Sequence, residues 1–247
     1  TLEAITADSG VVALAEPTGA RQFMSPDSIG DLARLLQEYP QARLVAGGTD
    51  LCLEFTQFLR DIDVLIYTGR VTELLQINES ASAVEIGAAV TFTQAHDVLV
   101  QYYPDLHELL ERLGSLQIRN QGTIGGNIGN ASPIGDMPPV LIALGADIVL
   151  RCGQNSRRIA LQDYYLSYKK TAQQASEFIE SIILPKPQAG YKFRAYKISK
   201  RLEDDISATC AAISICLDGD TVRDARIAFG GMAEIPARAS NCEKALV

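Results

Sequence analysis

Two glycine-bearing runs, far apart in the chain, constrain this protein more than any other feature. Residues 44–51 have the sequence LVAGGTDL and residues 123–127 have the sequence TIGGN, with SPIGD following at residues 132–136. Glycine lets a backbone approach a ligand closely and adopt positive φ angles. Successive N–H groups in such turns form a concavity that binds anions. Two such runs predict a long, diphosphate-bearing ligand that is held at two places.

Neither run has the spacing of a better-known phosphate motif. The sequence matches neither G-x-G-x-x-G, typical of a Rossmann domain, nor the P-loop pattern G-x-x-x-x-G-K-[ST]. A nicotinamide-binding Rossmann domain is therefore disfavoured. The alternative interpretation of each run is a tight turn without a ligand.

Charge and hydropathy restrict the partners of the chain. Its 247 residues are enough for one large domain or two small ones. A net charge of −8 argues against nucleic acid or an acidic membrane surface as the main partner. No apolar run reaches bilayer length, and the first residues have no basic segment of a signal peptide. We expect a cytoplasmic protein with no nucleic-acid or membrane partner.

The sequence contains no recognisable set of metal-ligating or catalytic side chains. The five cysteines have neither zinc nor iron–sulfur spacing, so no metal is expected in this chain. The two histidines, His96 and His107, fall in predicted amphipathic helices and are interpreted as surface or core residues. The chemistry is therefore expected to come from a bound cofactor that the protein positions.

Helical spacing and capping residues predict most of the helices. Ser25 followed by Pro26 predicts an N-cap, with a helix running to the residues before Pro40. Thr91 and Gln94 form a capping-box pattern, which predicts a helix over residues 92–102. The other predicted helices cover residues 51–59, 106–113, 137–144 and 241–247. Residues 118–131, rich in Gly and Asn, are expected to form an ordered loop.

The predicted strands divide the chain into a mixed part and a β-rich part. Short strands are predicted at residues 43–46, 64–67, 84–88, 148–150, 178–184, 191–199, 208–217 and 222–229. Asp218-Gly219-Asp220 is a strong hairpin signal between the last two. Residues 185–190 form the predicted boundary.

A third region, residues 196–206 with the sequence YKISKRLEDDI, places basic and acidic side chains side by side at the end of a predicted strand. An exposed charged turn of small energetic effect is one interpretation. The other is an electrostatic patch beside a redox cofactor.

In order and rough spacing, residues 44–51, 123–136 and 196–206 resemble the FAD-binding domain of molybdenum hydroxylases, above all the small iron–sulfur/flavin subunit of bacterial xanthine dehydrogenases. The resemblance implies an α+β fold of the vanillyl-alcohol-oxidase type. In such a fold two α/β subdomains clasp FAD and a smaller α+β domain follows. Applied to this chain, it implies a linker remnant at residues 1–16, an FAD-binding domain at 17–187 and a truncated C-terminal domain at 188–247.

The resemblance also implies roles for individual residues. The first run would bind the FAD diphosphate through backbone amides, and the second would form the opposite wall. Asp136 would hydrogen-bond the polar chain of the cofactor, and Lys197 would place a positive charge near the flavin ring. Leu113 stands where animal relatives stack an aromatic side chain. The implied cofactor-binding residues are Leu44, Val45, Ala46, Gly47, Gly48, Thr49, Asp50, Leu51, Thr123, Ile124, Gly125, Gly126, Asn127, Asp136, Ile179 and Lys197.

The implied function is electron transfer in a xanthine dehydrogenase. Electrons would arrive from [2Fe-2S] clusters, and reduced FAD would pass a hydride to NAD⁺, with Arg201, Asp204 and Asp205 tuning NAD⁺ access. The clusters and the molybdopterin would belong to partner domains or subunits, which implies a hetero-oligomer. The alternatives are the flavin subunit of another molybdenum hydroxylase, acting on carbon monoxide, an aldehyde or a heteroaromatic ring, a non-redox nucleotide-binding module, and a plain α+β domain.

Overall fold

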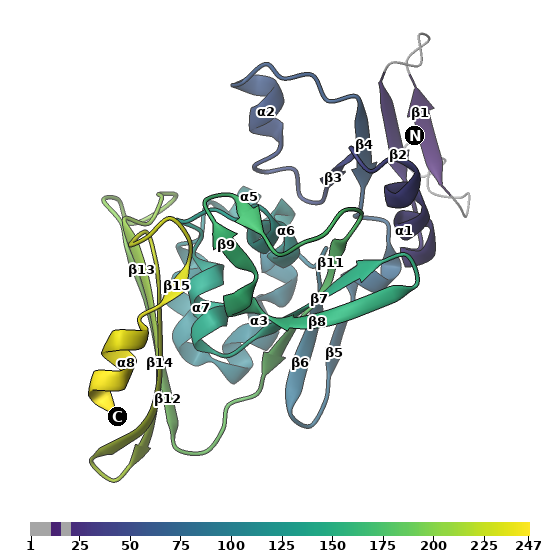
Figure 1. Ribbon diagram of the computed structural model, residues 1–247. Helices are drawn as coiled ribbons and strands as arrows, with labels where there is room; N and C mark the ends of the chain where they lie inside the picture. The colour runs from purple at the N-terminus through teal and green to yellow at the C-terminus, as the bar shows by residue number, and fades with distance from the viewer. Residues whose placement is uncertain (1–10, 16–20) are drawn as a thin grey trace.

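The described residues form three larger β-sheets and one short hairpin, with helices packed between two of the sheets (Figure 1). The computed structural model describes residues 11–15 and 21–247. The predicted linker at residues 1–16 therefore lies mostly outside the described residues, but Val12–Ala15 within it forms strand β1. No helix in the described ranges is both long and apolar enough to span a bilayer.

The first sheet belongs to an N-terminal lobe. It has the order β1-β2-β4-β3, with β2 parallel to β4 and β3 parallel to β4. Its core contains Leu32 of helix α1 and Ile66 of strand β4, both fully buried. The elements of this lobe are β1 (Val12–Ala15), β2 (Gln22–Ser25), α1 (Ile29–Glu38), β3 (Arg43–Val45), α2 (Cys52–Thr56) and β4 (Val64–Tyr67).

Two of the predicted helices in this lobe have different bounds. Helix α1 is capped by Ser28, whose Oγ accepts from the Asp31 N–H at 3.2 Å. The prediction of Ser25 as N-cap was wrong, because Ser25 is still paired with Val12 in the sheet. The helix predicted over residues 51–59 is limited to α2, which buries no side chain and so gains nothing from packing a longer helix.

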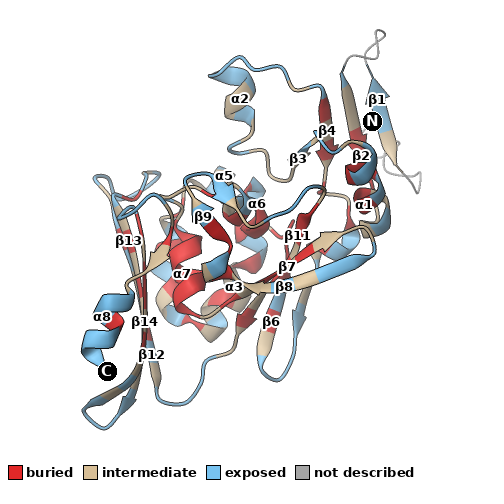
Figure 2. Ribbon diagram, in the orientation of Figure 1, coloured by how far each residue is buried: buried red, intermediate tan, exposed pale blue. Residues whose placement is uncertain are grey.

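The second sheet is antiparallel with the order β5-β6-β11-β7-β8, and helices cover the face that it turns toward the third sheet (Figures 1 and 2). Its strands are β5 (Ile77–Glu79), β6 (Ala83–Gly87), β7 (Asp147–Cys152), β8 (Asn155–Ala160) and β11 (Phe178–Pro185), with β9 (Tyr165–Ser167) and β10 (Lys170–Thr171) as a separate hairpin. The helices are α3 (Phe92–Tyr102), α4 (His107–Glu111), α5 (Leu116–Gln121), α6 (Ile124–Gly129) and α7 (Met137–Ala143), with 3₁₀ turns at η2 (Thr72–Leu75), η3 (Pro104–Leu106) and η4 (Leu161–Asp163).

The capping box of α3 is confirmed, whereas the loop prediction after it was wrong. The N–H of Gln94 donates to Thr91 Oγ1 at 3.2 Å, and the N–H of Thr91 donates to Gln94 Oε1 at 2.9 Å. Residues 118–131 were expected to be a loop, but they contain most of α5 and all of α6. Ser115 and Thr123 cap these two helices and offset the weak helix propensity of the Gly- and Asn-rich sequence.

The third sheet is antiparallel and closes the C-terminal end. It consists of β12 (Tyr191–Ile198), β13 (Thr209–Asp218), β14 (Thr221–Gly230) and β15 (Ala237–Arg238), and α8 (Ser240–Leu246) follows it. The hairpin predicted at residues 218–220 is confirmed, with Gly219 at φ +60°. Helix α7, whose seven residues are all buried, packs on β13 and β14 and joins this sheet to the rest of the core. The predicted domain boundary at residues 187/188 falls between β11 and β12.

Candidate cofactor site

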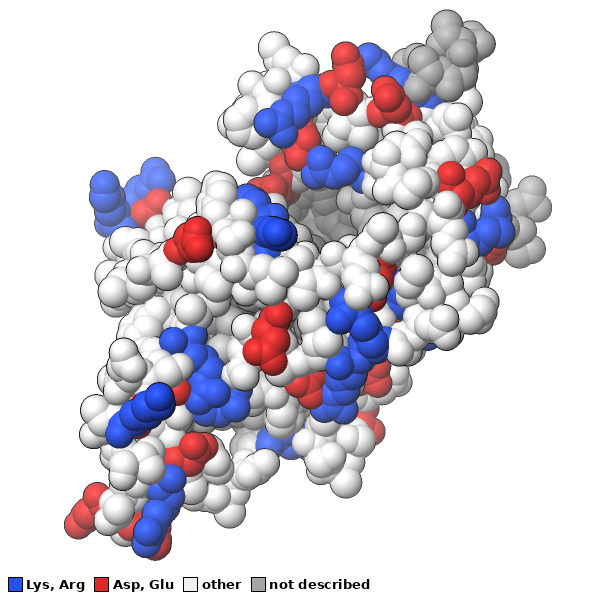
Figure 3. All heavy atoms as spheres, in the orientation of Figure 1, with Lys and Arg blue, Asp and Glu red and all other residues white. Residues whose placement is uncertain are grey.

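A cavity of about 980 Å³ lies where the N-terminal lobe meets the helices of the second sheet. Its walls come from the loop after β3, the α5–α6 region, the segment before β11, and the end of β12 with the turn that follows. Figure 3 shows a hollow between the lobe that carries α2 and the body of the molecule, with charged side chains on its rim. Ligand pockets are commonly 300–1,000 Å³, so this cavity can take a large cofactor.

The first glycine run presents a row of unpaired backbone donors to this cavity. In the described part of the chain, the N–H groups of residues 47–51 donate to no acceptor, and the first paired amide is that of Cys52, which donates to Gly48 O at 2.9 Å. Gly48 has φ +71°, which a residue with a Cβ adopts at a cost. Adjacent free amides of this kind form an anion-binding nest. The loop therefore fits a diphosphate.

Gly47 is needed for a reason that its sequence context did not reveal. A Cβ at this position would lie 1.9 Å from the carbonyl oxygen of Gln121 and 2.9 Å from Cα of Gly122. The first run thus packs its backbone directly on the turn between α5 and α6. This contact brings the two glycine runs together in space.

The second run differs from the first because its backbone donors are already used. The N–H groups of Ile124 and Gly125 donate to Val90 O and Ala88 O, each at 3.0 Å, and that of Gly126 donates to Thr123 Oγ1 at 3.0 Å. This run is therefore no second amide nest. It does offer Asn127, whose Oδ1 is buried without a hydrogen-bond partner among the described residues. An orphan acceptor at a cavity wall fits a ligand that donates a hydrogen bond there.

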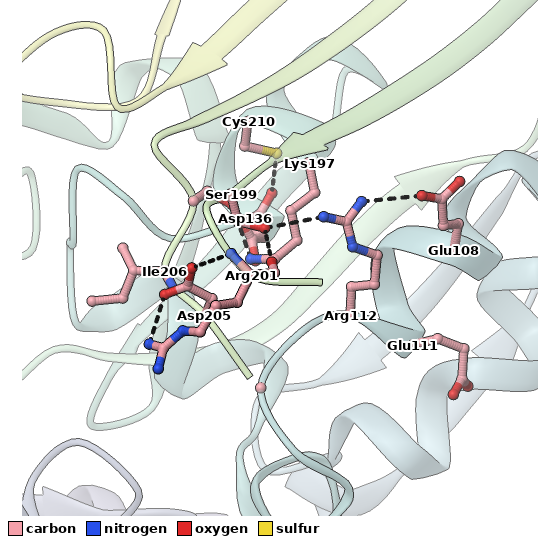
Figure 4. Close-up of polar contacts among 12 residues, drawn as sticks. Glu108, Glu111, Arg112, Asp136, Lys197, Ser199, Arg201, Asp205, Ile206 and Cys210 are labelled. Atoms are coloured by element: carbon pink, nitrogen blue, oxygen red, sulfur yellow. Dashed lines mark hydrogen bonds and ion pairs between the residues drawn. The ribbon is translucent and has the colours of Figure 1, made fainter. Parts of the chain in front are cut away.

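Asp136 and Lys197, which were predicted as two separate site residues, form a buried ion pair. Lys197 Nζ lies 2.6 Å from Asp136 Oδ2 and 2.9 Å from Ser207 Oγ. Ser207 Oγ in turn donates to Asp136 Oδ1 at 2.5 Å. The Lys197 side chain is 2% exposed and that of Asp136 is 8% exposed. Figure 4 shows the two side chains pointing toward each other from β12 and the start of α7.

The ammonium group of Lys197 keeps some donor capacity. An ammonium carries three N–H donors, and Asp136 and Ser207 use two of them. Because Lys197 lines the cavity, the third donor is available to a ligand. Burial, together with the carboxylate of Asp136, raises the pKa of the nearby Cys210 thiol to about 12, so this thiol stays protonated.

The charged turn after β12 is tightly hydrogen-bonded and held from outside by α4. Asp205 accepts from the backbone N–H of Arg201 at 2.8 Å and from its guanidinium at 3.1 Å. Arg112, just past the end of α4, donates to Leu202 O and to Ser199 Oγ, each at 3.0 Å (Figure 4). Asp204 has φ +49°, a strained value for a residue with a Cβ. These contacts fix the turn at the rim of the cavity.

The structure brings most of the predicted site residues to one cavity. The predicted residues that line it are Leu44, Ala46, Gly47, Gly48, Thr49, Asp50, Leu51, Leu113, Thr123, Gly125, Gly126, Asn127, Asp136, Ile179, Lys197, Asp204 and Asp205. Val45, Ile124 and Arg201 do not line it. Val45 is paired in β3, Ile124 is 1% exposed in the main core, and the Arg201 side chain is 77% exposed.

One wall of the cavity, residues 173–178, was not predicted. Glu177 anchors it, because its carboxylate accepts from Arg157 at 2.7 and 2.8 Å and from the Gln174 N–H at 2.6 Å. The guanidinium of Arg157 is the main cause that lowers the pKa of Glu177. Ser176, at φ +58°, donates to Leu36 O at 3.0 Å and ties this wall to α1. Before the strand, residues 173–177 form only a polar stretch in the sequence, which carries no recognisable motif.

The carboxylate of Asp205 should become protonated only at a pH well below the usual range of an aspartate. The backbone N–H of Arg201, with the guanidinium of the same residue, lowers the pKa of Asp205 from 3.8 to about 2. Because the pKa of Asp205 is lowered in the folded state, its ionised carboxylate stabilises the turn above about pH 4. This stabilisation is lost as the pH falls toward 2. We expect the Arg201 amide proton shift, followed by NMR, to titrate with a midpoint near 2. The titration should vanish in Asp205→Asn, and a midpoint near 4 would contradict the hydrogen bonds described.

Comparisons with known proteins agree with this geometry. A family model described as "FAD binding domain in molybdopterin dehydrogenase" matches residues 19–187, and a "CO dehydrogenase flavoprotein C-terminal domain" model matches residues 194–247. The solved carbon monoxide dehydrogenase of Hydrogenophaga pseudoflava superposes with a TM-score of 0.86 at 30% identity, covering 91% of this chain and 79% of that one. The mixed α+β fold class predicted from the sequence is thereby confirmed.

The similar curated proteins act on different substrates, as their names state. The glyceraldehyde dehydrogenase medium chain of Sulfolobus acidocaldarius is 30% identical over 91% of this chain and 80% of its own length. The nicotinate dehydrogenase FAD-subunit of Eubacterium barkeri is 30% identical over 80% and 69%, respectively. Chicken xanthine dehydrogenase/oxidase is 28% identical over 85% of this chain but 17% of its own length. The chain belongs to the family of FAD-binding domains of molybdopterin dehydrogenases, and it is the FAD-binding part of a molybdenum hydroxylase.

Proposed function

We propose that this chain holds FAD in the 980 Å³ cavity and carries electrons from the [2Fe-2S] clusters of a partner to NAD⁺, as part of a xanthine dehydrogenase. The observation that carries the proposal is the row of unpaired amides at residues 47–51 on the wall of a cavity that also contains the buried Lys197 ammonium. Bound FAD supplies two-electron redox chemistry, which no side chain of this site provides.

Different residues would bind different parts of the cofactor. The amides of residues 47–51 would bind the diphosphate, with no positive side chain needed. Asn127 Oδ1 would accept a hydrogen bond from the cofactor's polar chain. Lys197, oriented by Asp136 and Ser207, would direct its remaining N–H toward the flavin ring. Because the ion pair is neutral overall, the local potential at the ring would be milder than that of an isolated lysine.

Partner chains would supply the remaining cofactors. In the described part of the chain, the one group of three side chains that could hold a metal ion contains no cysteine. All five cysteines are free thiols. Iron–sulfur clusters are held by grouped cysteine thiolates. We therefore propose a hetero-oligomer in which other subunits or domains hold the clusters and the molybdopterin. The similar proteins whose names say "medium chain" and "FAD-subunit" support this arrangement.

NADH reduction of the flavin tests the acceptor. Under anaerobic conditions, NADH should bleach the absorbance of the FAD-loaded protein, because hydride transfer between FAD and NAD⁺ is reversible. Dithionite serves as the positive control for a reducible flavin. A flavin that dithionite bleaches and NADH leaves unchanged would contradict NAD⁺ as the acceptor while leaving FAD binding intact.

An aldehyde substrate is the second candidate, and one observation favours it. The glyceraldehyde dehydrogenase medium chain is 30% identical over 91% of this chain, against 28% over 85% for chicken xanthine dehydrogenase/oxidase. The enzyme assembled with its partner subunits should reduce NAD⁺ with xanthine and not with glyceraldehyde. The opposite preference would replace xanthine by an aldehyde in the proposal.

A further inference from the structure

We propose that the chain carries a binding site for a divalent transition metal of the Zn²⁺ class, formed by His96, His107 and Glu111 on helices α3 and α4. One possible ligand atom from each of the three residues lies within 4.8 Å of the other two. None of the three lines the cofactor cavity, so the site is separate from the proposed flavin function. Figure 4 shows Glu111 pointing away from Asp136 and Lys197.

The helices present these side chains in a suitable arrangement. His107 and Glu111 stand four residues apart at the two ends of α4, so they share one face of that helix. His96 comes from the neighbouring α3, and its ring meets that of His107 edge-on, with centroids 5.5 Å apart. Two imidazoles and one carboxylate form a known zinc ligand set, with a fourth position left for water.

The hydrogen bond on one side of His96 determines what its other nitrogen can do. His96 Nδ1 lies 2.9 Å from Asp97 Oδ1, and an ionised carboxylate only accepts, so Nδ1 carries the proton. In the neutral ring, Nε2 then carries a lone pair. A histidine that binds zinc through one ring nitrogen usually donates the N–H of its other ring nitrogen to a carboxylate or carbonyl oxygen, which fixes its tautomer and orientation.

That lone pair faces another acceptor rather than a donor. His96 Nε2 is buried, has no hydrogen-bond partner among the described residues, and lies 3.5 Å from Glu111 Oε1. Ligand atoms about 2.0–2.1 Å from a tetrahedral metal are themselves about 3.4 Å apart. A cation between these two atoms would satisfy both. The remaining separation, up to 4.8 Å to His107, is within reach of side-chain rotation at an exposed residue.

A further charged side chain, that of Arg119, faces the site. Arg119 Nη2 lies 3.4 Å from Glu111 Oε2, the oxygen that is not near His96, and Arg119 Nη1 donates to backbone carbonyls. Arg119 therefore orients the Glu111 carboxylate without occupying the gap. The alternative to a metal is a doubly protonated His96 that bridges Asp97 and Glu111, and this is one outcome of the test.

A bound metal would tie α3 to α4 close to the cofactor cavity. The residue after Glu111 is Arg112, which holds the charged turn through Leu202 O and Ser199 Oγ. The next residue, Leu113, lines the cavity. A metal that links α3 to α4 would therefore hold Arg112 more firmly in place, and with it the charged turn at the rim of the cavity.

Zinc titration of the full chain by calorimetry, repeated with Co²⁺ and followed by visible absorption, tests the proposal. We expect one metal per chain, and His107→Ala and Glu111→Gln should each lower the affinity at least about ten-fold. Glu108→Gln, which removes the same charge from the same helix, should leave it unchanged. Asp97→Asn should lower it by about ten-fold through the loss of the carboxylate contact with His96 Nδ1. At 100-fold excess over Kd, zinc should raise Tm by about 5–10 °C, reversibly with EDTA.

Three results would overturn the proposal. One is the absence of metal binding, which would leave the imidazolium bridge as the account of His96. Another is equal affinity in the His107, Glu111 and Glu108 variants. The last is Co²⁺ absorption with thiolate charge-transfer bands, which would place the metal on the free cysteines, two of which, Cys52 and Cys242, are exposed.

Discussion

Lys197→Met should lower the free energy of unfolding by about 3–5 kcal/mol, because it leaves the Asp136 carboxylate buried without its counter-ion. Asp136 is 7% exposed, and only Ser207 would remain as a side-chain partner for its carboxylate. Asp136 is the N-cap of α7, whose seven residues are all buried, so the unpaired carboxylate would lie beside the core. In a domain of this size the loss corresponds to a Tm lower by about 10 °C, measurable by calorimetry.

A double variant separates the ion pair from the rest of the effect. Asp136→Leu with Lys197→Met removes both buried charges, so its loss of stability should be well below the sum of the two single losses. The same cycle measured by FAD affinity reports whether Lys197 also contacts the cofactor. A Tm change of less than 1 °C in Lys197→Met would contradict the buried pair.

Gly47→Ala should destabilise the chain by about 1–3 kcal/mol and weaken FAD binding by about 100-fold. A Cβ cannot lie 1.9 Å from the Gln121 carbonyl oxygen, so the loop must move away from the α5–α6 turn. That movement displaces the row of amides at residues 47–51. Losing two hydrogen bonds to a charged diphosphate, each worth about 1.5 kcal/mol, accounts for the affinity change. Fluorescence titration with FAD measures it.

Gly129→Ala is the matched control for this prediction. Gly129 also lines the cavity, but a Cβ there would make an ordinary contact, 3.5 Å from Ile179 Cδ1. It should therefore change both stability and FAD affinity far less. Equal effects of the two substitutions would mean that the backbone contact at Gly47 does not position the loop.

The strongly patterned elements of the fold could be predicted from the sequence. The capping box at Thr91 and Gln94 and the turn at Gly219 depend on local chemistry, and both form as expected. The edge strand β8 was missed because its sequence, NSRRIA, carries no apolar alternation and pairs on one side only. Helix α6 was missed because its glycines are weak helix formers. Its stability comes from the Thr123 cap and from amides bound to carbonyls that lie distant in the sequence.

The site could be predicted as a set of residues but not as a network. Sequence motifs predicted the first glycine run, Asp136 and Lys197 as site residues, each independently of the others. The ion pair between Asp136 and Lys197 joins residues that α7 and β12 bring together, and nothing in the local sequence encodes it. Ser207 and Glu177 were missed for the same reason, since each gains its role from a partner distant in the chain.

Whether the cavity binds FAD is tested by the visible absorption spectrum of the purified chain after incubation with FAD and gel filtration, with chromatography of the cofactor released by heat. We expect a flavin spectrum and one FAD per chain, with FMN absent. A protein that remains colourless after this treatment would contradict the assignment of the cavity as an FAD site.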